Sequence, residues 1–155
     1  MAKADLKAIL EQESTGKVDR PKPLPMGTYL AVIRGPHEFD TAATGTDFVL
    51  FNAEILEAYD DVDADDLKSW AQRADGSTRK LRGTPVPRLI FYMTPDAKWR
   101  LDKFFEDLGI LEKGKTTDEI LSECPGREFV VNIIHKPSQD GEVQYANVKS
   151  TAPAP

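Results

Sequence analysis

The chain has 155 residues, of which 40% are hydrophobic, and a formal net charge of -6. This length fits a single domain, because a core of that size is stable without metals or disulfides. No apolar run approaches the ~20 residues of a membrane span, and no basic and then apolar opening indicates a secretory signal. The single cysteine, Cys124, cannot form an internal disulfide. We therefore expect a soluble, intracellular protein that contacts no membrane.

The two ends of the chain differ in composition from its middle. Residues 1–13 place Leu6, Ile9 and Leu10 at helical spacing, which predicts a short helix. The next stretch, STGKVDRPKPLP, contains three prolines and no apolar periodicity, as in a linker. We assign residues 1–24 to a short helix and a Pro-rich linker, residues 25–150 to the folded domain, and residues 151–155 to a flexible tail.

Strand-forming residues gather in three runs in the first part of the domain. GTYLAVIRG (27–35) is bounded by glycine, and TDFVLFNAEILEAY (46–59) alternates between two faces, so each predicts a strand. The polar stretch that follows predicts a long excursion with a short helix near 67–72. PRLIFYM (87–93) predicts the third strand.

Helix signals come together after the third strand. Thr94 can cap a helix, Pro95 suits its first position and Gly109 can end it, so we predict a helix over 95–108. A second short helix is predicted to start at Thr116, which begins a capping box.

The last two predicted strands, 127–136 and 142–149, are joined by a hairpin turn at Asp140-Gly141. The resulting order is strand, strand, strand, helix, strand, strand. This is the connectivity of an OB-type fold, so we predict a mainly β fold with α: a five-stranded Greek-key barrel with a helix between strands 3 and 4. An antiparallel sheet backed by a helix would give a similar order.

Few residues are candidates for catalysis or metal binding. His37 and His135 have no second His or Cys at a ligand spacing. The run Asp61-x-Asp63-x-Asp65 lacks the glycine and the glutamate of a calcium loop, and indicates a solvated acidic loop. Phosphate-cradling and nucleophile-elbow motifs are absent. We predict that the chain is not an enzyme and needs no metal or cofactor.

Charge is divided unevenly along the chain. Residues 54–66 contain seven acids and no bases, whereas residues 73–103 contain eight bases and three acids. Because the local field governs where an anion binds, the basic segment can attract nucleic acid although the whole chain is acidic. Aromatic residues are interleaved with these bases.

A binder of single strands needs cations for the phosphates and aromatic faces on which bases stack. In the third strand, Arg88 and Tyr92 share one face and form a plausible pair of this kind. Tyr92 could equally pack beneath the helix, since most strand aromatics belong to the core. The predicted nucleic-acid-binding residues are Arg34, Phe48, Trp70, Arg73, Arg79, Lys80, Arg82, Arg88, Tyr92, Lys136 and Tyr145.

Trp99 lies on the polar face of the predicted helix, beside Lys103 and nearly opposite the apolar stripe. Three partners can cover it: DNA, another subunit, or its own long loop or amino-terminal helix. We expect cover from its own chain first, because that is the commoner fate of such residues. Trp99 and Lys103 form the predicted interaction surface.

Four stretches carry a resemblance to a known family: PLPMGTYLAVI, TGTDFVLFNAEILEA, RLIFYMTPDAKWRLDKFFEDLGI and PGREFVVNIIHK. They resemble phage-encoded single-stranded DNA-binding proteins of the small OB-fold type, over roughly residues 25–150. The resemblance implies a protein that coats single strands during phage replication and recombination in the cytoplasm of the infected bacterium. It also implies phage or host replication and recombination proteins as partners, and is compatible with a homo-oligomer.

Two functions follow as hypotheses. The first is binding of single-stranded DNA without sequence preference, through strands two and three and the basic loop between them. The alternative is a protein-interaction module of the same fold, which engages a phage or host replication enzyme through the helix face that bears Trp99.

Overall fold

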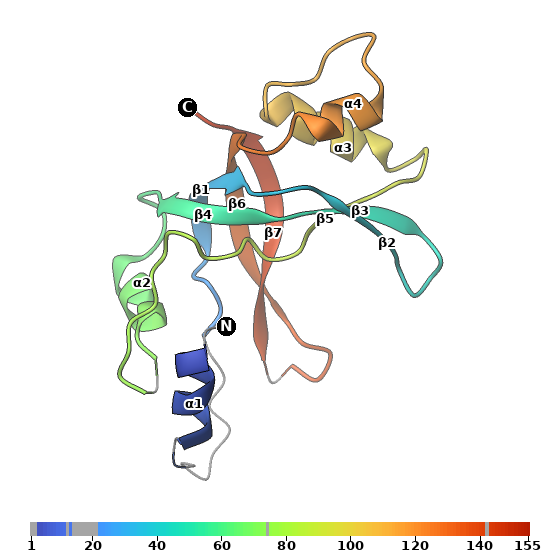
Figure 1. Cartoon of the computed structure of the whole chain (residues 1–155). Coiled ribbons are helices and arrows are strands. Elements are labelled where there is room, and N and C mark those ends of the chain that lie inside the picture. Colours follow the sequence, from blue (N-terminus) through green and yellow to red (C-terminus); the bar gives the residue numbers. More distant parts are fainter. Residues whose placement is uncertain (1–2, 12, 14–21, 74, 142) are drawn as a thin grey trace.

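The computed structural model describes residues 3–11, 13, 22–73, 75–141 and 143–155 (Figure 1). Within these residues the chain is mainly β, with short helices between the strands. The helices are α1 (Lys3–Glu11), α2 (Ala64–Ala71), α3 (Lys98–Asp107) and α4 (Thr117–Ser122). The strands are β1 (Gly27–Ile33), β2 (Glu38–Thr41), β3 (Asp47–Phe51), β4 (Ala53–Ala58), β5 (Leu89–Tyr92), β6 (Glu128–Pro137) and β7 (Gln144–Pro153).

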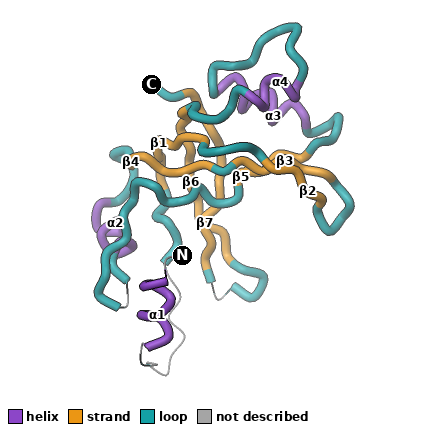
Figure 2. Tube along the Cα trace, in the orientation of Figure 1, coloured by secondary structure: helices purple, strands orange, loops and turns teal. Residues whose placement is uncertain are grey.

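The strands form two antiparallel sheets, ordered β4-β1-β6-β7 and β2-β3-β5 (Figure 2). Only Asn52 separates β3 from β4, so the single strand predicted over 46–59 passes from one sheet to the other. At this break the amide of Arg34 donates to the carbonyl of Asn52 at 2.7 Å, which joins the end of β1 to the crossing point.

The segment before β5 continues along β4. Val86 donates its amide to the carbonyl of Ala53 at 2.9 Å, and the amide of Ile55 donates to the carbonyl of Thr84 at 2.8 Å. Pro85 and Pro87 have no amide hydrogen, so this pairing is irregular. The strand predicted over 87–93 is regular over Leu89–Tyr92. Residues 83–92 thus accompany β3 and β4 along most of their length.

The five-stranded closed barrel that we expected is not formed. Among the described residues, β5 and β7 are edge strands of different sheets, and no ladder joins them. What the structure shows is the coarser part of the prediction, a mainly β fold with antiparallel sheets and helices. None of the helices within the described ranges is long and apolar enough to cross a membrane.

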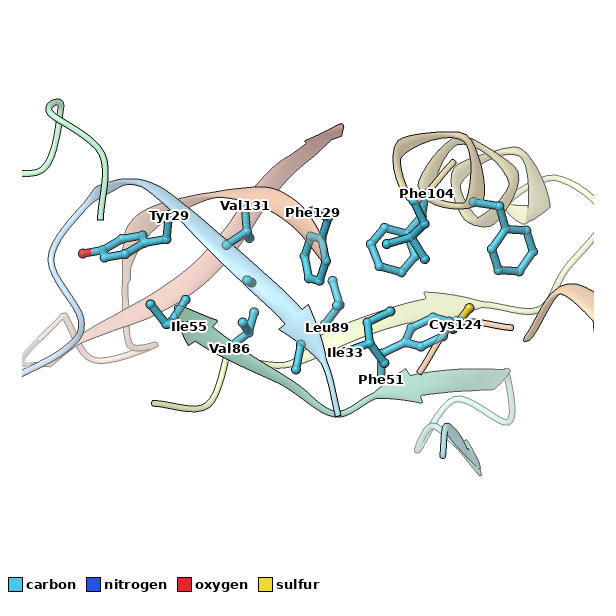
Figure 3. Close-up of a cluster of buried hydrophobic side chains, with 14 of the residues drawn as sticks. Tyr29, Ile33, Phe51, Ile55, Val86, Leu89, Phe104, Cys124, Phe129 and Val131 are labelled. Carbon is cyan, nitrogen blue, oxygen red and sulfur yellow. The ribbon is translucent and has the colours of Figure 1, made fainter. Parts of the chain in front are cut away.

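The core lies between the two sheets and beneath α3. Buried side chains alternate along the first part of β6, as the strand period requires, whereas the last three residues of β1 are all buried. Phe104 of α3 packs where the sheets meet (Figure 3). The centre of its ring lies 4.9 Å from the ring centre of Phe91 in β5. The corresponding distances are 5.2 Å to Phe51 in β3 and 5.1 Å to Phe129 in β6. Burial of this apolar face therefore holds α3 over the space between β5 and β7.

Several boundaries differ from the prediction. The helix expected over 95–108 begins at Lys98, because the carbonyl of Thr94 first accepts hydrogen bonds from Ala97 and Lys98 in a separate turn. The short helix at Thr116 is confirmed: the hydroxyl of Thr116 accepts the amide of Glu119 at 3.2 Å. The short helix near 67–72 is also present and starts earlier, with Asp63 as its cap.

The prediction for the amino-terminal end of the chain is confirmed in part, and the prediction for the carboxyl-terminal end is wrong. The amino-terminal helix is present as α1, with Leu6, Ile9 and Leu10 exposed, and most of the proposed linker lies outside the described residues. At the carboxyl end, β7 continues to Pro153 and pairs with β6 as far as Phe129, where we expected a flexible tail. The backbone pairing of residues 151–153 does not require alternating side chains, so composition could not reveal it.

Candidate nucleic-acid interface

A groove of about 750 Å³ separates the facing edges of β5 and β7, with α3 along one side. We call it the β5–β7 groove. One wall is formed by β5 and Arg88 before it, and a second by α3 and Ala97 before it. The third is formed by β7 and by Lys136 near the end of β6. The lining residues are Arg88–Tyr92, Ala97, Trp99, Arg100, Lys103, Lys136 and Asn147–Thr151.

Charge in this groove is of one sign. Five of its side chains are cationic and none is acidic, although the whole chain carries a net charge of -6. Over the described ranges, four of the five form no ion pair, namely Arg88, Arg100, Lys136 and Lys149. Unneutralised cations around a concave surface attract phosphate groups.

Two exposed aromatic rings accompany the cations. Trp99 of α3 is 61% exposed, and the guanidinium of Arg100 lies 5.4 Å from its ring centre. Tyr92 of β5 is 38% exposed and meets the ring of Phe48 edge-on at 6.1 Å. The cover from its own chain that we expected first for Trp99 is therefore wrong, and Tyr92 lies outside the core.

The second and third predicted strands present the faces that their alternation indicates. Val49 and Phe51 of β3 are buried, whereas Phe48 and Leu50 face the other way and are only partly buried. In β5, Leu89 is buried on the inner side and Tyr92 is exposed on the outer side. Tyr92 of this outer aromatic pair lines the β5–β7 groove, whereas Phe48 lines an adjacent hollow that also contains Arg88.

A hydrogen-bonded cluster joins α3 to β7 beside the groove. The carboxylate of Asp107, which is only 5% exposed, accepts the hydroxyl of Thr151 at 2.6 Å and the ammonium of Lys103 at 2.7 Å. The same ammonium donates to the carbonyl of Thr151 at 2.8 Å. Among the described residues, Lys103 is therefore the one groove cation whose charge is partly neutralised, and its contacts hold α3 against β7.

Arg88 has an unusual backbone at the start of β5. Its φ is 24°, the one positive φ found at a residue other than glycine among the described residues. A side chain at such φ is strained, and strain of this kind is held in place by the surrounding structure. Arg88 lines the β5–β7 groove and two adjacent hollows, so its guanidinium stands where these surfaces meet.

The basic loop residues predicted for nucleic acid gather elsewhere. They line a second hollow of about 560 Å³, which we call the loop hollow. Its lining residues are Trp70, Arg73, Thr78–Lys80 and Arg82–Pro85. None of its described lining residues is acidic, and four of the predicted cations share this surface, which is distinct from the β5–β7 groove.

The prediction that Trp70 binds nucleic acid is wrong. It is 3% exposed at the end of α2, so its ring belongs to the core and cannot stack on a base. Arg79 covers it, with the guanidinium 4.6 Å from the ring centre and Nη2 donating to the carbonyl of Lys22 at 3.3 Å. Burial, with a smaller contribution from the nearby Arg73, lowers the pKa of Arg79. These contacts give Arg79 a structural role.

The remaining predicted residues lie at the borders of these surfaces. Arg34 forms an ion pair with Glu54 at 3.4 Å and lines a hollow between the other two. Tyr145 is exposed on β7 and pairs directly with Lys136 of β6, which places both on one face of the sheet. Arg100 and Lys149 were missed: Arg100 adjoins Trp99 in sequence, whereas nothing in the β7 sequence reveals that Lys149 faces β5.

The histidines have structural contacts. Nε2 of His135 lies 2.7 Å from the carbonyl oxygen of Leu24, and the ring of His37 packs on those of Phe39 and Phe51. In the described part of the chain, no group of three or more His, Cys, Asp or Glu side chains could hold a metal ion.

No family model matches the chain, and no curated protein matches it.

Proposed function

We propose that the chain binds single-stranded DNA in the β5–β7 groove. The observation that carries this proposal is the gathering of five cations and no acid around the exposed ring of Trp99. Cations follow the phosphates and an aromatic face receives a base, which contributes about 1–3 kcal/mol for each stacked base. Because every base has such a face, binding of this kind does not depend on sequence.

The order of the strands supports an OB-type architecture. Counting β3 with β4 as one strand, the hydrogen-bonded neighbours run β5, β3 with β4, β1, β6 and β7. A closed OB barrel would complete this order by pairing the strands that correspond to β5 and β7. We propose that the chain is an OB-type barrel opened at this seam, and that the open seam is the binding groove.

The biological setting rests on the resemblance described above. We propose that the protein protects single strands during phage replication or recombination in the cytoplasm of the infected bacterium. Phage or host replication proteins are the proposed partners, and no catalytic step is part of this role.

Titration with labelled oligo-dT at low salt tests the proposed function. Affinity should fall steeply as salt is added, with a logarithmic slope of about 0.7 for each phosphate that is neutralised. The double variant Arg100→Glu, Lys149→Glu should weaken binding at least tenfold and reduce that slope. Lys113→Glu, Arg127→Glu, which changes the charge equally and lies outside the groove lining, should have a much smaller effect. Absence of binding at micromolar protein would overturn the proposal.

A second candidate function uses the same exposed ring. Trp99 and Lys103 could dock a partner protein, since tryptophan is enriched at protein interfaces. The exposure of Trp99 favours this candidate, whereas the cations around it favour DNA. Binding of a partner protein with no response to oligo-dT would select this alternative.

A further inference from the structure

Two basic surfaces of the chain are joined by a third hollow. This smaller hollow, of about 290 Å³, includes Pro85, which also lines the loop hollow. It also includes Arg88 and Leu89, which line the β5–β7 groove. The three hollows therefore adjoin one another through shared lining residues, and we call the route from the groove, past Arg88 and Pro85, to the loop hollow the path.

The cations at the far end of this path form no ion pair among the described residues, and the nearest acid is Asp75. Hydrogen bonds from Ser77, with a smaller contribution from the nearby Arg73, lower the pKa of Asp75. The cations themselves, Arg73, Lys80 and Arg82, are exposed. Arg73 also lies near enough to Arg79 to disfavour its charged form. Like charges crowded on a concave surface repel one another, and an anion placed between them relieves that repulsion.

Of the described residues that line the three hollows, Glu54 of the joining hollow is the one acid. Arg34 also lines this hollow, and Nε of Arg34 lies 3.4 Å from Oε2 of Glu54. Both side chains are largely exposed, so their attraction is weak and easily displaced. A phosphate at this point would compete with Glu54 for Arg34.

We propose that a single strand longer than the groove continues along this path into the loop hollow, so that DNA binding is bipartite. This inference rests on the proposed function of the β5–β7 groove. A short strand occupies the groove alone, and a long strand also places phosphates beside Lys80 and Arg82. Affinity then rises with oligonucleotide length beyond what the larger number of overlapping sites provides.

The test compares a short and a long oligo-dT, of about 6 and about 20 nucleotides, by fluorescence anisotropy. Lys80→Glu, Arg82→Glu should leave short-strand affinity within about twofold and weaken long-strand affinity about tenfold or more, with a smaller salt slope. Arg100→Glu, Lys149→Glu should weaken both. Lys113→Glu, Arg127→Glu is the control of equal charge. Arg79 stays unchanged in every variant, because it covers Trp70.

A gain of affinity provides a second test that does not depend on damage to the fold. Glu54→Gln removes the competitor for Arg34 and should strengthen long-strand binding about threefold, with short-strand binding unchanged. Equal long-strand affinity in the Lys80, Arg82 variant and the native protein would overturn the bipartite path and leave the groove proposal intact. Equal weakening of both lengths would also overturn it, because the loop would then act only through its long-range field. Failure of the native protein to bind either length would overturn the proposed function itself.

Discussion

The carboxylate of Asp107 on α3 accepts a hydrogen bond from the hydroxyl of Thr151 on β7, with 2.6 Å between the oxygens. The helix is held against β5 by the stacked rings of Phe104 and Phe91, and against β7 by this polar contact. Because β5 and β7 have no ladder between them in the described structure, these two contacts fix the distance across the groove.

Asp107→Ala should lower the free energy of unfolding by about 1–3 kcal/mol, because Lys103 and Thr151 lose a buried acceptor. Urea denaturation measures this change. Asp102→Ala on the same helix removes an exposed pair with Lys98 at 3.0 Å, and should change stability by less than about 1 kcal/mol. Equal losses of unfolding free energy in the two variants would show that the contact between Asp107 and β7 stabilises the protein no more than an exposed ion pair does.

Trp99→Ala should weaken oligo-dT binding by about 1–3 kcal/mol with little effect on stability, because the side chain is exposed and offers a stacking surface. Trp99→Phe should retain most of the affinity and abolish the fluorescence quenching that accompanies binding. Trp70→Phe is the matched control: it should lower stability, because Trp70 is buried, and leave the quenching in place. Quenching that survives in the Trp99→Phe variant would contradict this assignment.

Arg88→Gly should be more stable than Arg88→Ala by about 1 kcal/mol, because glycine tolerates a positive φ that strains alanine. Both variants should lose affinity for DNA, since both lack the guanidinium. At Arg34, whose φ is not positive, the order should reverse, with glycine less stable than alanine. Thermal unfolding of the four variants measures their stabilities, and titration of the Arg88 variants with DNA measures their affinities. The prediction fails if glycine and alanine rank alike at both positions.

The Cys124 thiol should react slowly with a thiol reagent in the native protein at pH 8. Burial, with a smaller contribution from Glu123, raises its pKa to about 12, so the reactive thiolate is scarce. The pKa of this thiol is higher in the folded protein than the value of about 8.5 in the unfolded chain. Its contribution to stability is therefore complete below about pH 8.5 and is lost as the pH rises toward about 12. Labelling should accelerate with urea in step with unfolding. Immediate labelling without urea would show that the site is open.

Sequence patterns predicted an element where its own residues favour that element, through strand-forming side chains or through capping residues. The strand-forming residues between the glycines at 27–35 and the capping box at Thr116 each specify an element through neighbours in sequence, and both elements are present. β2 was not predicted, because EFDT has no buried side and is a strand only by virtue of its pairing with β3. A strand that depends on a partner has no signal of its own.

The candidate site was predicted in part for the same reason. Arg88 and Tyr92, which line the groove, were predicted as nucleic-acid-binding residues because they share one face of the third predicted strand. Trp99, which also lines it, was predicted as part of an interaction surface because it lies on the polar face of the helix. Trp70 was also predicted as a nucleic-acid-binding residue, but it is buried in the core with the guanidinium of Arg79 over its ring.

By itself, the sequence determined the order of the elements other than β2, the two faces of the second and third predicted strands, and a basic, aromatic segment in an acidic chain. Only the tertiary structure decided that β5 and β7 stay apart, that Lys136 and Lys149 face Trp99 across the gap, and that the basic loop forms a second surface. Periodicity and capping act between near neighbours in sequence, whereas the groove depends on how α3 packs between two sheets. That packing is set by contacts between residues far apart in the chain, such as Asp107 with Thr151 and Phe104 with Phe51.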